Sequence, residues 1–293
     1  MANEANMGFA KRLDEIGLAS ENSEKLEWAQ IALGKVVVAN SERAWLYQPQ
    51  STEDRFAHPM ECAGSFATTK KLLDTAIAAA KVAVKSDSRP PALTSTRWVW
   101  RLAGAYHLTT PASQLFTDAA VGFAANGRSH LESWALEKVE EETGHDKLAL
   151  LDIKSLGYDA EAVVAELTPP AAIALVDYFT RSVQDDDPID VVGYAYTMER
   201  LSMGIEEDYI EKVESLIPPK INATRCLRVH SSLGADAHHA EENISLVANL
   251  SPAERTRIAR ACYETALMLF SPPPKGYVSN DELQAKLEPL KVN

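Results

Sequence analysis

Apolar residues recur at every third or fourth position along most of the chain, which is the spacing of amphipathic helices rather than of strands. The alanine-rich segment from Phe66 to Val84 shows this spacing clearly and has a high intrinsic helix propensity. The same pattern predicts further helices over 98–106, 113–125, 130–156, 171–183, 189–203, 209–217, 225–248 and 252–269. Strand patterns are scarce, so the sequence predicts an all-α fold.

The N-terminal segment is less regular. Residues 1–20 are interpreted as a loose arm, and from Glu24 to about Tyr47 apolar residues again recur at helical spacing. The run Val36-Val37-Val38 could also belong to a strand, because β-branched residues favour strands. We interpret the segment as a helix because its periodicity extends well beyond the usual length of a strand.

Proline and glycine mark the ends of the predicted helices. Gly157 is expected to end the long helix over 130–156 as a C-terminal cap. The best linker candidate is 86–91, a segment too short to establish a domain boundary. We therefore expect a single helical domain over 1–293, with a C-terminal tail over 272–293.

With 293 residues, the chain can bury a full hydrophobic core without disulfides. Its three cysteines, Cys62, Cys226 and Cys262, form no Cys-x-x-Cys pair, which argues against a thiolate zinc site and suits a reducing cytoplasm. A net charge of −13 without a basic cluster argues against a nucleic-acid partner. With no signal-peptide pattern and no long apolar run, a soluble cytoplasmic protein without a membrane partner is expected.

Candidate chemistry begins with an acidic segment of the helix predicted over 130–156. Glu142 and His145 lie one helical turn apart, and Asp152 follows on the same side of a helix. A carboxylate and an imidazole at this spacing can form half of a metal site. They can equally be part of a solvated acidic face.

A second candidate is Glu199, which lies in the middle of an apolar stripe formed by residues such as Val192, Tyr196 and Met203. A buried carboxylate without a partner costs several kcal/mol. Glu199 therefore needs a cation, and the sequence leaves open whether this is a metal ion or an arginine.

The third candidate lies within 225–248, where His230, His238 and His239 account for three of the seven histidines of the chain. Asp236 and His239 share a helix face, whereas His238 points about 100° away from it and is expected on the surface. Oxygen and nitrogen ligands without cysteine, spread over a helical bundle, are typical of non-haem iron or manganese.

Residues 130–250 resemble the haem-oxygenase-like diiron oxidases, also called iron-containing redox enzymes. The resemblance rests on the three motifs Glu141-Glu142-Thr-Gly-His145-Asp146, Tyr196-Thr-Met-Glu199, and His230 with Asp236-x-x-His239. It implies a haem-oxygenase-like bundle of about seven core helices, preceded here by extra N-terminal helices.

The resemblance also implies two iron ions, held by Glu142, His145, Glu199, His230, Asp236 and His239. Glu141 is a rival for Glu142, and Asp146 and Asp152 are candidates for supporting the ligands by hydrogen bonds. One feature departs from the family, because five residues separate His230 from Asp236 where three are usual. A bulge at Gly234 could bring His230 back to the side of the helix that carries Asp236 and His239. Without this bulge, the site would hold a single iron or manganese ion, or would bind a second one weakly.

By this resemblance the protein activates O2 and oxidises a small organic substrate, by amine N-oxygenation or by oxidative C–C cleavage. Two alternatives stay open. One is a metal-free enzyme on the same fold, like the thiaminase-like and quinone-forming relatives, in which Glu199 and the histidines act as acid and base. The other is a non-catalytic helical binding protein. Apolar faces on the early helices would suit a homodimer.

Overall fold

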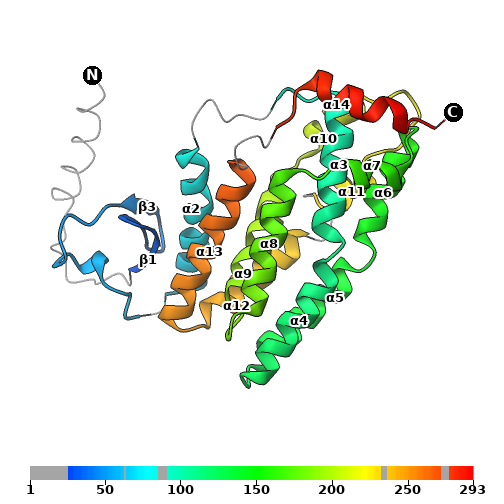
Figure 1. Cartoon of the computed structure of the whole chain (residues 1–293). Coiled ribbons are helices and arrows are strands. Elements are labelled where there is room, and N and C mark those ends of the chain that lie inside the picture. Colours follow the sequence, from blue (N-terminus) through cyan, green and yellow to red (C-terminus); the bar gives the residue numbers. More distant parts are fainter. Residues whose placement is uncertain (1–25, 63, 85–90, 232–235, 272–276, 293) are drawn as a thin grey trace, which may run out of the picture.

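The computed structural model of the chain describes residues 26–62, 64–84, 91–231, 236–271 and 277–292, without the side chains of 236–240. The described part is mainly helical, which confirms the predicted all-α fold (Figure 1). The helices are α2 (Phe66–Ala83), α3 (Ser95–Thr109), α4 (Ala112–Ala125), α5 (Ser129–Glu142), α6 (His145–Ser155), α7 (Ala160–Glu166), α8 (Pro170–Gln184), α9 (Asp190–Ser202), α10 (Glu207–Glu214), α11 (Arg225–Val229), α12 (Asp236–Ala248), α13 (Pro252–Phe270) and α14 (Asn280–Leu287). The loose arm expected over 1–20 lies outside the described residues.

The helix predicted from Glu24 to about Tyr47 is wrong. This segment forms an antiparallel sheet of three strands, β1 (Glu27–Ala32), β2 (Lys35–Ala39) and β3 (Ala44–Tyr47), in the order β1-β2-β3. Gly34 turns the chain between β1 and β2 with a φ of +66°. The β-branched valines of β2 are buried on both faces of the sheet, so the alternation typical of a strand is absent from the sequence.

The long helix predicted over 130–156 is also interrupted. It is divided into α5 and α6 at Thr143 and Gly144, and Gly144 has a φ of +88°. This left-handed conformation is rarely adopted by residues with a Cβ atom. The two halves therefore leave the break in different directions.

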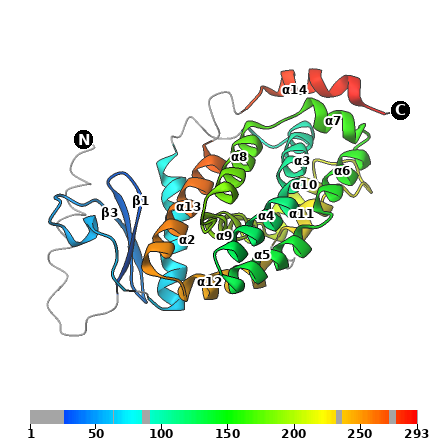
Figure 2. The ribbon, with the colours of Figure 1, turned by 60° about the horizontal axis from the view of Figure 1, so that its bottom comes forward.

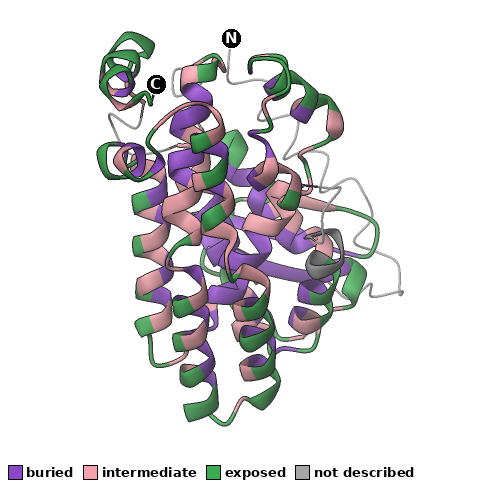
Figure 3. Cartoon of the chain, turned by 90° about the vertical axis from the view of Figure 1, so that its right-hand side faces the viewer, coloured by how far each residue is buried: buried purple, intermediate pink, exposed green. Residues whose placement is uncertain are grey.

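The helices enclose two hydrophobic cores. Figure 3 shows that buried residues occur along most of the helices, beside exposed ones. What we call the first core takes buried residues from the sheet and from α2, α4, α5, α8, α9, α12 and α13. The second core takes them from α3, α6, α7, α10, α11 and α14. The sheet covers α2 and α13 on one side of the bundle (Figure 2).

The tail predicted over 272–293 packs against the bundle in its described part. Leu283 and Leu287 of α14 are buried in the second core. The Arg97 guanidinium donates hydrogen bonds to the Val278 carbonyl at 2.7 Å and to the Asn280 side chain at 2.8 Å. Among the described residues, no single helix has the length and hydrophobicity to cross a membrane, although the sharply bent pair α7 and α8 meets both criteria together.

A buried ion pair joins the sheet to the bundle. The Arg255 guanidinium of α13 contacts the Glu27 carboxylate of β1, and both side chains are fully buried. Arg255 also donates to Thr69 of α2 and, at 2.8 Å, to the carbonyl of Ala248. This cluster connects β1, α2 and α13.

We expect Glu27→Gln to destabilise the protein by about 3–5 kcal/mol, because it leaves the Arg255 charge buried without a counter-charge. Chemical denaturation measures the free energy of unfolding. Glu53→Gln, on an exposed side chain, is the control and is expected to change it by less than about 0.5 kcal/mol. Equal stability of the two variants would contradict the role of the pair.

Candidate metal centre

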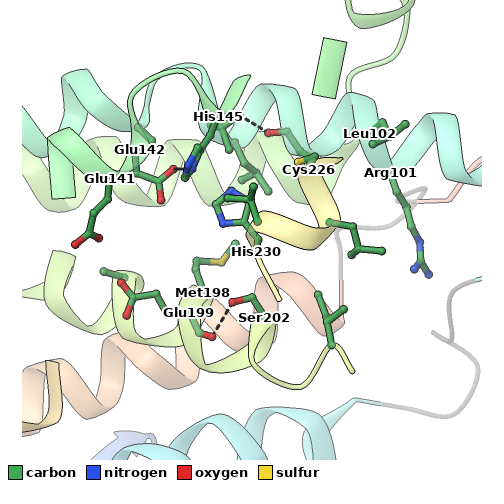
Figure 4. Close-up of a pocket in the computed structure, with 18 of the residues that line it drawn as sticks. Arg101, Leu102, Glu141, Glu142, His145, Met198, Glu199, Ser202, Cys226 and His230 are labelled. Atoms are coloured by element: carbon green, nitrogen blue, oxygen red, sulfur yellow. Dashed lines mark hydrogen bonds and ion pairs between the residues drawn. The ribbon is translucent and has the colours of Figure 1, made fainter. Parts of the chain in front are cut away.

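Three side chains from two parts of the chain meet beside a cavity (Figure 4). Glu142 is the last residue of α5, His145 is the first residue of α6, and His230 directly follows α11. Glu142 Oε2 lies 3.3 Å from His145 Nδ1, and the two imidazole rings are perpendicular with centroids 4.6 Å apart. One potential ligand atom from each residue lies within 4.8 Å of the others.

The break at Gly144 sets the relative positions of Glu142 and His145. The sequence places both on one face of a continuous helix, whereas the structure places them on opposite sides of a turn. A Cβ atom at Gly144 would meet no heavy atom within 4 Å, so the restriction at this position is conformational rather than steric.

His230 reaches the site because the helix predicted over 225–248 is interrupted. α11 ends at Val229 and α12 begins at Asp236, so His230 lies in the connection rather than on a straight helix. The five-residue spacing to Asp236 does not keep His230 from the site. Gly234, where a bulge was expected, lies outside the described residues.

Asp152 fixes the element that carries His230. Its side chain is fully buried, and it accepts hydrogen bonds at 2.9 Å from the Cys226 backbone N–H and from the Arg225 guanidinium. Burial raises the pKa of Asp152, and the hydrogen bonds from Cys226 and Arg225 offset this effect only in part. Asp152 thus holds α11 against α6 and supports His230 through the backbone. Asp146, the other candidate for support, lies in the first turn of α6.

Glu199 of α9 has a lysine partner, where the sequence left a metal ion or an arginine open. Lys138 Nζ lies 2.9 Å from Glu199 Oε1 and 2.7 Å from Glu141 Oε2. Glu199 Oε2 accepts a hydrogen bond of 2.6 Å from Asn243, which in turn accepts one of 2.6 Å from the Trp134 indole. Burial disfavours the charged ammonium, but Glu199 and Glu141 outweigh it and raise the pKa of Lys138.

The two remaining candidates, Asp236 and His239, belong to the first turns of α12, and their side chains lie outside the described part of the structure. The same holds for His238. The six expected ligands are therefore divided. Glu142, His145 and His230 lie together, and Glu199 is hydrogen-bonded to Lys138 and Asn243.

The adjoining cavity has a volume of about 720 Å³ and is lined mainly by apolar side chains. Tyr194 lines it, and burial, together with the charge of Glu142, raises the pKa of the Tyr194 hydroxyl. Tyr196, two residues further along α9, donates a hydrogen bond of 2.7 Å to Asp74. Arg101 lies across the cavity from Glu142 and donates to the Tyr209 hydroxyl (Figure 4).

Sequence reasoning missed Lys138, Asn243 and Arg101. Lys138 lies four residues before Glu142 and seven before His145, so it shares their face in the helical pattern. That spacing was a usable indication. Asn243 and Arg101 gave none, because their roles depend on contacts with distant segments.

The three grouped side chains fit an iron ion. Two histidines and one carboxylate that leave open positions form the ligand set of many non-haem Fe(II) oxygenases. Glu142, His145 and His230 supply that set on the wall of a cavity, and all three are only partly buried. A substrate in the cavity could therefore approach the ion.

A model of the family described as iron-containing redox enzymes matches residues 100–270. Two solved structures are similar. A domain of unknown function with a haem-oxygenase-like fold from Shewanella denitrificans OS217 has 20% identity, a TM-score of 0.53, and coverage of 74% of this chain and 88% of that one. A TenA homolog from Pseudomonas syringae pv. tomato DC3000 has 14% identity, a TM-score of 0.52, and coverage of 73% and 98%. No curated protein matches significantly. The haem-oxygenase-like fold expected from the sequence is confirmed.

The turn at Gly144 gives a test of the site geometry. We expect Gly144→Ala to destabilise the protein by about 1–2 kcal/mol and to weaken Fe(II) binding, because strain displaces Glu142 from His145. Gly127→Ala is a matched control, since Gly127 also has a positive φ (+69°) and free space around it but lies far along the chain from the site.

Denaturation and anaerobic Fe(II) titration of both variants measure the two effects. Similar losses of stability with weaker iron binding only in Gly144→Ala are the expected result. Unchanged iron binding in Gly144→Ala would show that the turn does not set the geometry of the site.

Proposed function

The chain belongs to the family of iron-containing redox enzymes, and from this premise we propose that it is a non-haem iron oxidase that uses O2 to oxidise a small, largely apolar organic substrate. The observation that carries the proposal is the grouping of Glu142, His145 and His230 on the wall of a cavity of about 720 Å³. Iron held there would supply the binding and reduction of O2.

The protein's own part is to hold and shield the reaction site. Glu142 contributes one negative charge, and His145 and His230 contribute neutral nitrogen donors, so the site favours a divalent cation. The apolar walls exclude water from the reacting groups. Burial raises the pKa of Tyr194, so its phenol stays protonated and can donate a hydrogen bond into the cavity.

The metal-free alternative uses the same fold. The similarity to a TenA homolog supports that fold, and His145 beside Glu142 resembles an acid–base pair. Iron binding separates the two functions, because acid–base chemistry needs no metal ion.

We expect the wild type to take up Fe(II) in anaerobic titration and then to consume O2 when air is admitted. His145→Ala and His230→Ala are each expected to weaken iron binding by more than about 10-fold, because each removes a direct ligand. His130→Ala, on an exposed histidine, is the control and should bind iron like the wild type. Equal iron uptake by the wild type and the His145 and His230 variants would refute this metal centre.

Arg101 favours a substrate that carries a negative charge. Among the described residues no carboxylate pairs with Arg101, and its hydrogen bond goes to the neutral Tyr209 hydroxyl. Glu207 and Glu214, on the same helix as Tyr209, both pair with Arg228. Arg101 and Thr109 of α3 both line the cavity, and they lie about 12 Å apart along the helix axis.

We therefore expect the iron-free protein to bind decanoate more tightly than decanol, with the carboxylate at Arg101. Arg101→Met should weaken decanoate binding by about 10-fold or more and leave decanol binding unchanged. Isothermal titration calorimetry measures both affinities, and Arg43→Met, at an exposed position, is the control. Equal affinity of the wild type for decanoate and decanol would contradict an anion site at Arg101.

A further inference from the structure

Lys138 is buried, which is unusual for a lysine, and lines the same cavity as the candidate metal centre. Its side chain is 5% exposed, and it comes from α5, one helical turn before Glu142. An ammonium group taken out of water needs compensating charge. Lys138 receives it from two carboxylates, Glu141 at 2.7 Å and Glu199 at 2.9 Å.

The ammonium therefore lies beside the Glu199 oxygen that a second metal ion could bind. A divalent ion bound to a carboxylate sits about 2.0–2.2 Å from the oxygen. An ion bound to Glu199 Oε1 would then be close to Lys138 Nζ, which is 2.9 Å from the same oxygen. Two cations at such a separation repel each other strongly in a buried site.

The other oxygen of Glu199 also has a donor. Asn243 donates to Glu199 Oε2 at 2.6 Å, and the Trp134 indole fixes the orientation of the Asn243 amide. Glu199 thus has a hydrogen-bond donor on each oxygen. A metal ion at Glu199 would have to share each oxygen with one of these donors.

Glu142 has no comparable cation. Among the described residues its charged partner is His145, whose imidazole can bind a metal ion when neutral. The two carboxylates thus differ, although both lie at the same cavity. Glu199 shares the positive charge of Lys138 with Glu141, whereas Glu142 has no ammonium beside it and its charge remains available to an iron ion.

We propose that Lys138 takes the place of a second metal ion, so that the chain binds one iron, at Glu142, His145 and His230, and Glu199 is a partner of Lys138 rather than a ligand. This inference rests on the proposed function, because it presupposes iron at the three grouped residues.

The experiment measures iron content by mass spectrometry after anaerobic equilibrium dialysis against Fe(II). We expect about one iron per chain in the wild type, and about two in Lys138→Met, which removes the ammonium but keeps an apolar stem. Lys147→Met changes an exposed lysine of α6 and should stay at about one. Glu199→Gln should also keep about one iron, which tests the proposal even if Lys138→Met does not fold.

Two irons in the wild type, one iron in folded Lys138→Met, or loss of iron from Glu199→Gln would each overturn the role of Lys138. A wild type that binds no iron would refute the proposed function instead. In that case uptake of iron by Lys138→Met alone would still support exclusion by Lys138, and no uptake by either protein would overturn it.

Discussion

The cost of removing a carboxylate from water governs how the parts of this molecule are held together. Each strongly buried carboxylate described here meets a cation from another element. Glu27 of β1 meets Arg255 of α13, and Asp152 of α6 meets Arg225 of α11. These pairs connect elements that are distant in the sequence. Glu199 of α9 follows the same rule through Lys138 of α5.

Glu142 differs from these carboxylates, because among the described residues no lysine or arginine pairs with it. Its neighbours are imidazoles, which have no fixed positive charge at neutral pH. The three side chains could therefore accept a divalent cation, as expected of a metal centre rather than of a structural ion pair. Two carboxylates at one cavity thus have different partners, a lysine for Glu199 and a histidine for Glu142.

Helical periodicity predicted most of the fold because most helices here bury one face and expose the other. It failed where burial is not one-sided. Val36, Val37 and Val38 of β2 are all buried, so neither strand alternation nor a polar face was visible. It also missed the break at Gly144, because a glycine within a helical pattern is often tolerated and only its φ shows the turn.

The site was predictable to the extent that its residues share local motifs. Glu142 and His145 stood out through their spacing, and His230 through the density of histidines around it. The pairing of Lys138 with Glu199 was not predictable, because it joins α5 to α9 and lysines are usually exposed. For the same reason the sequence could not distinguish a metal ligand from a partner of a buried lysine.

The position of the site follows from the way the chain passes between its two cores. α5 belongs to the first core and α6 to the second, so the chain crosses from one to the other at the turn between Glu142 and His145. It crosses again between α11 and α12, where His230 lies, and between α9 and α10, just after Glu199. Polar residues are tolerated at these crossings because neither core closes over them, and the cavity occupies the space between. Two cores packed side by side, rather than one continuous core, therefore account for why the titratable residues of distant segments meet at one cavity.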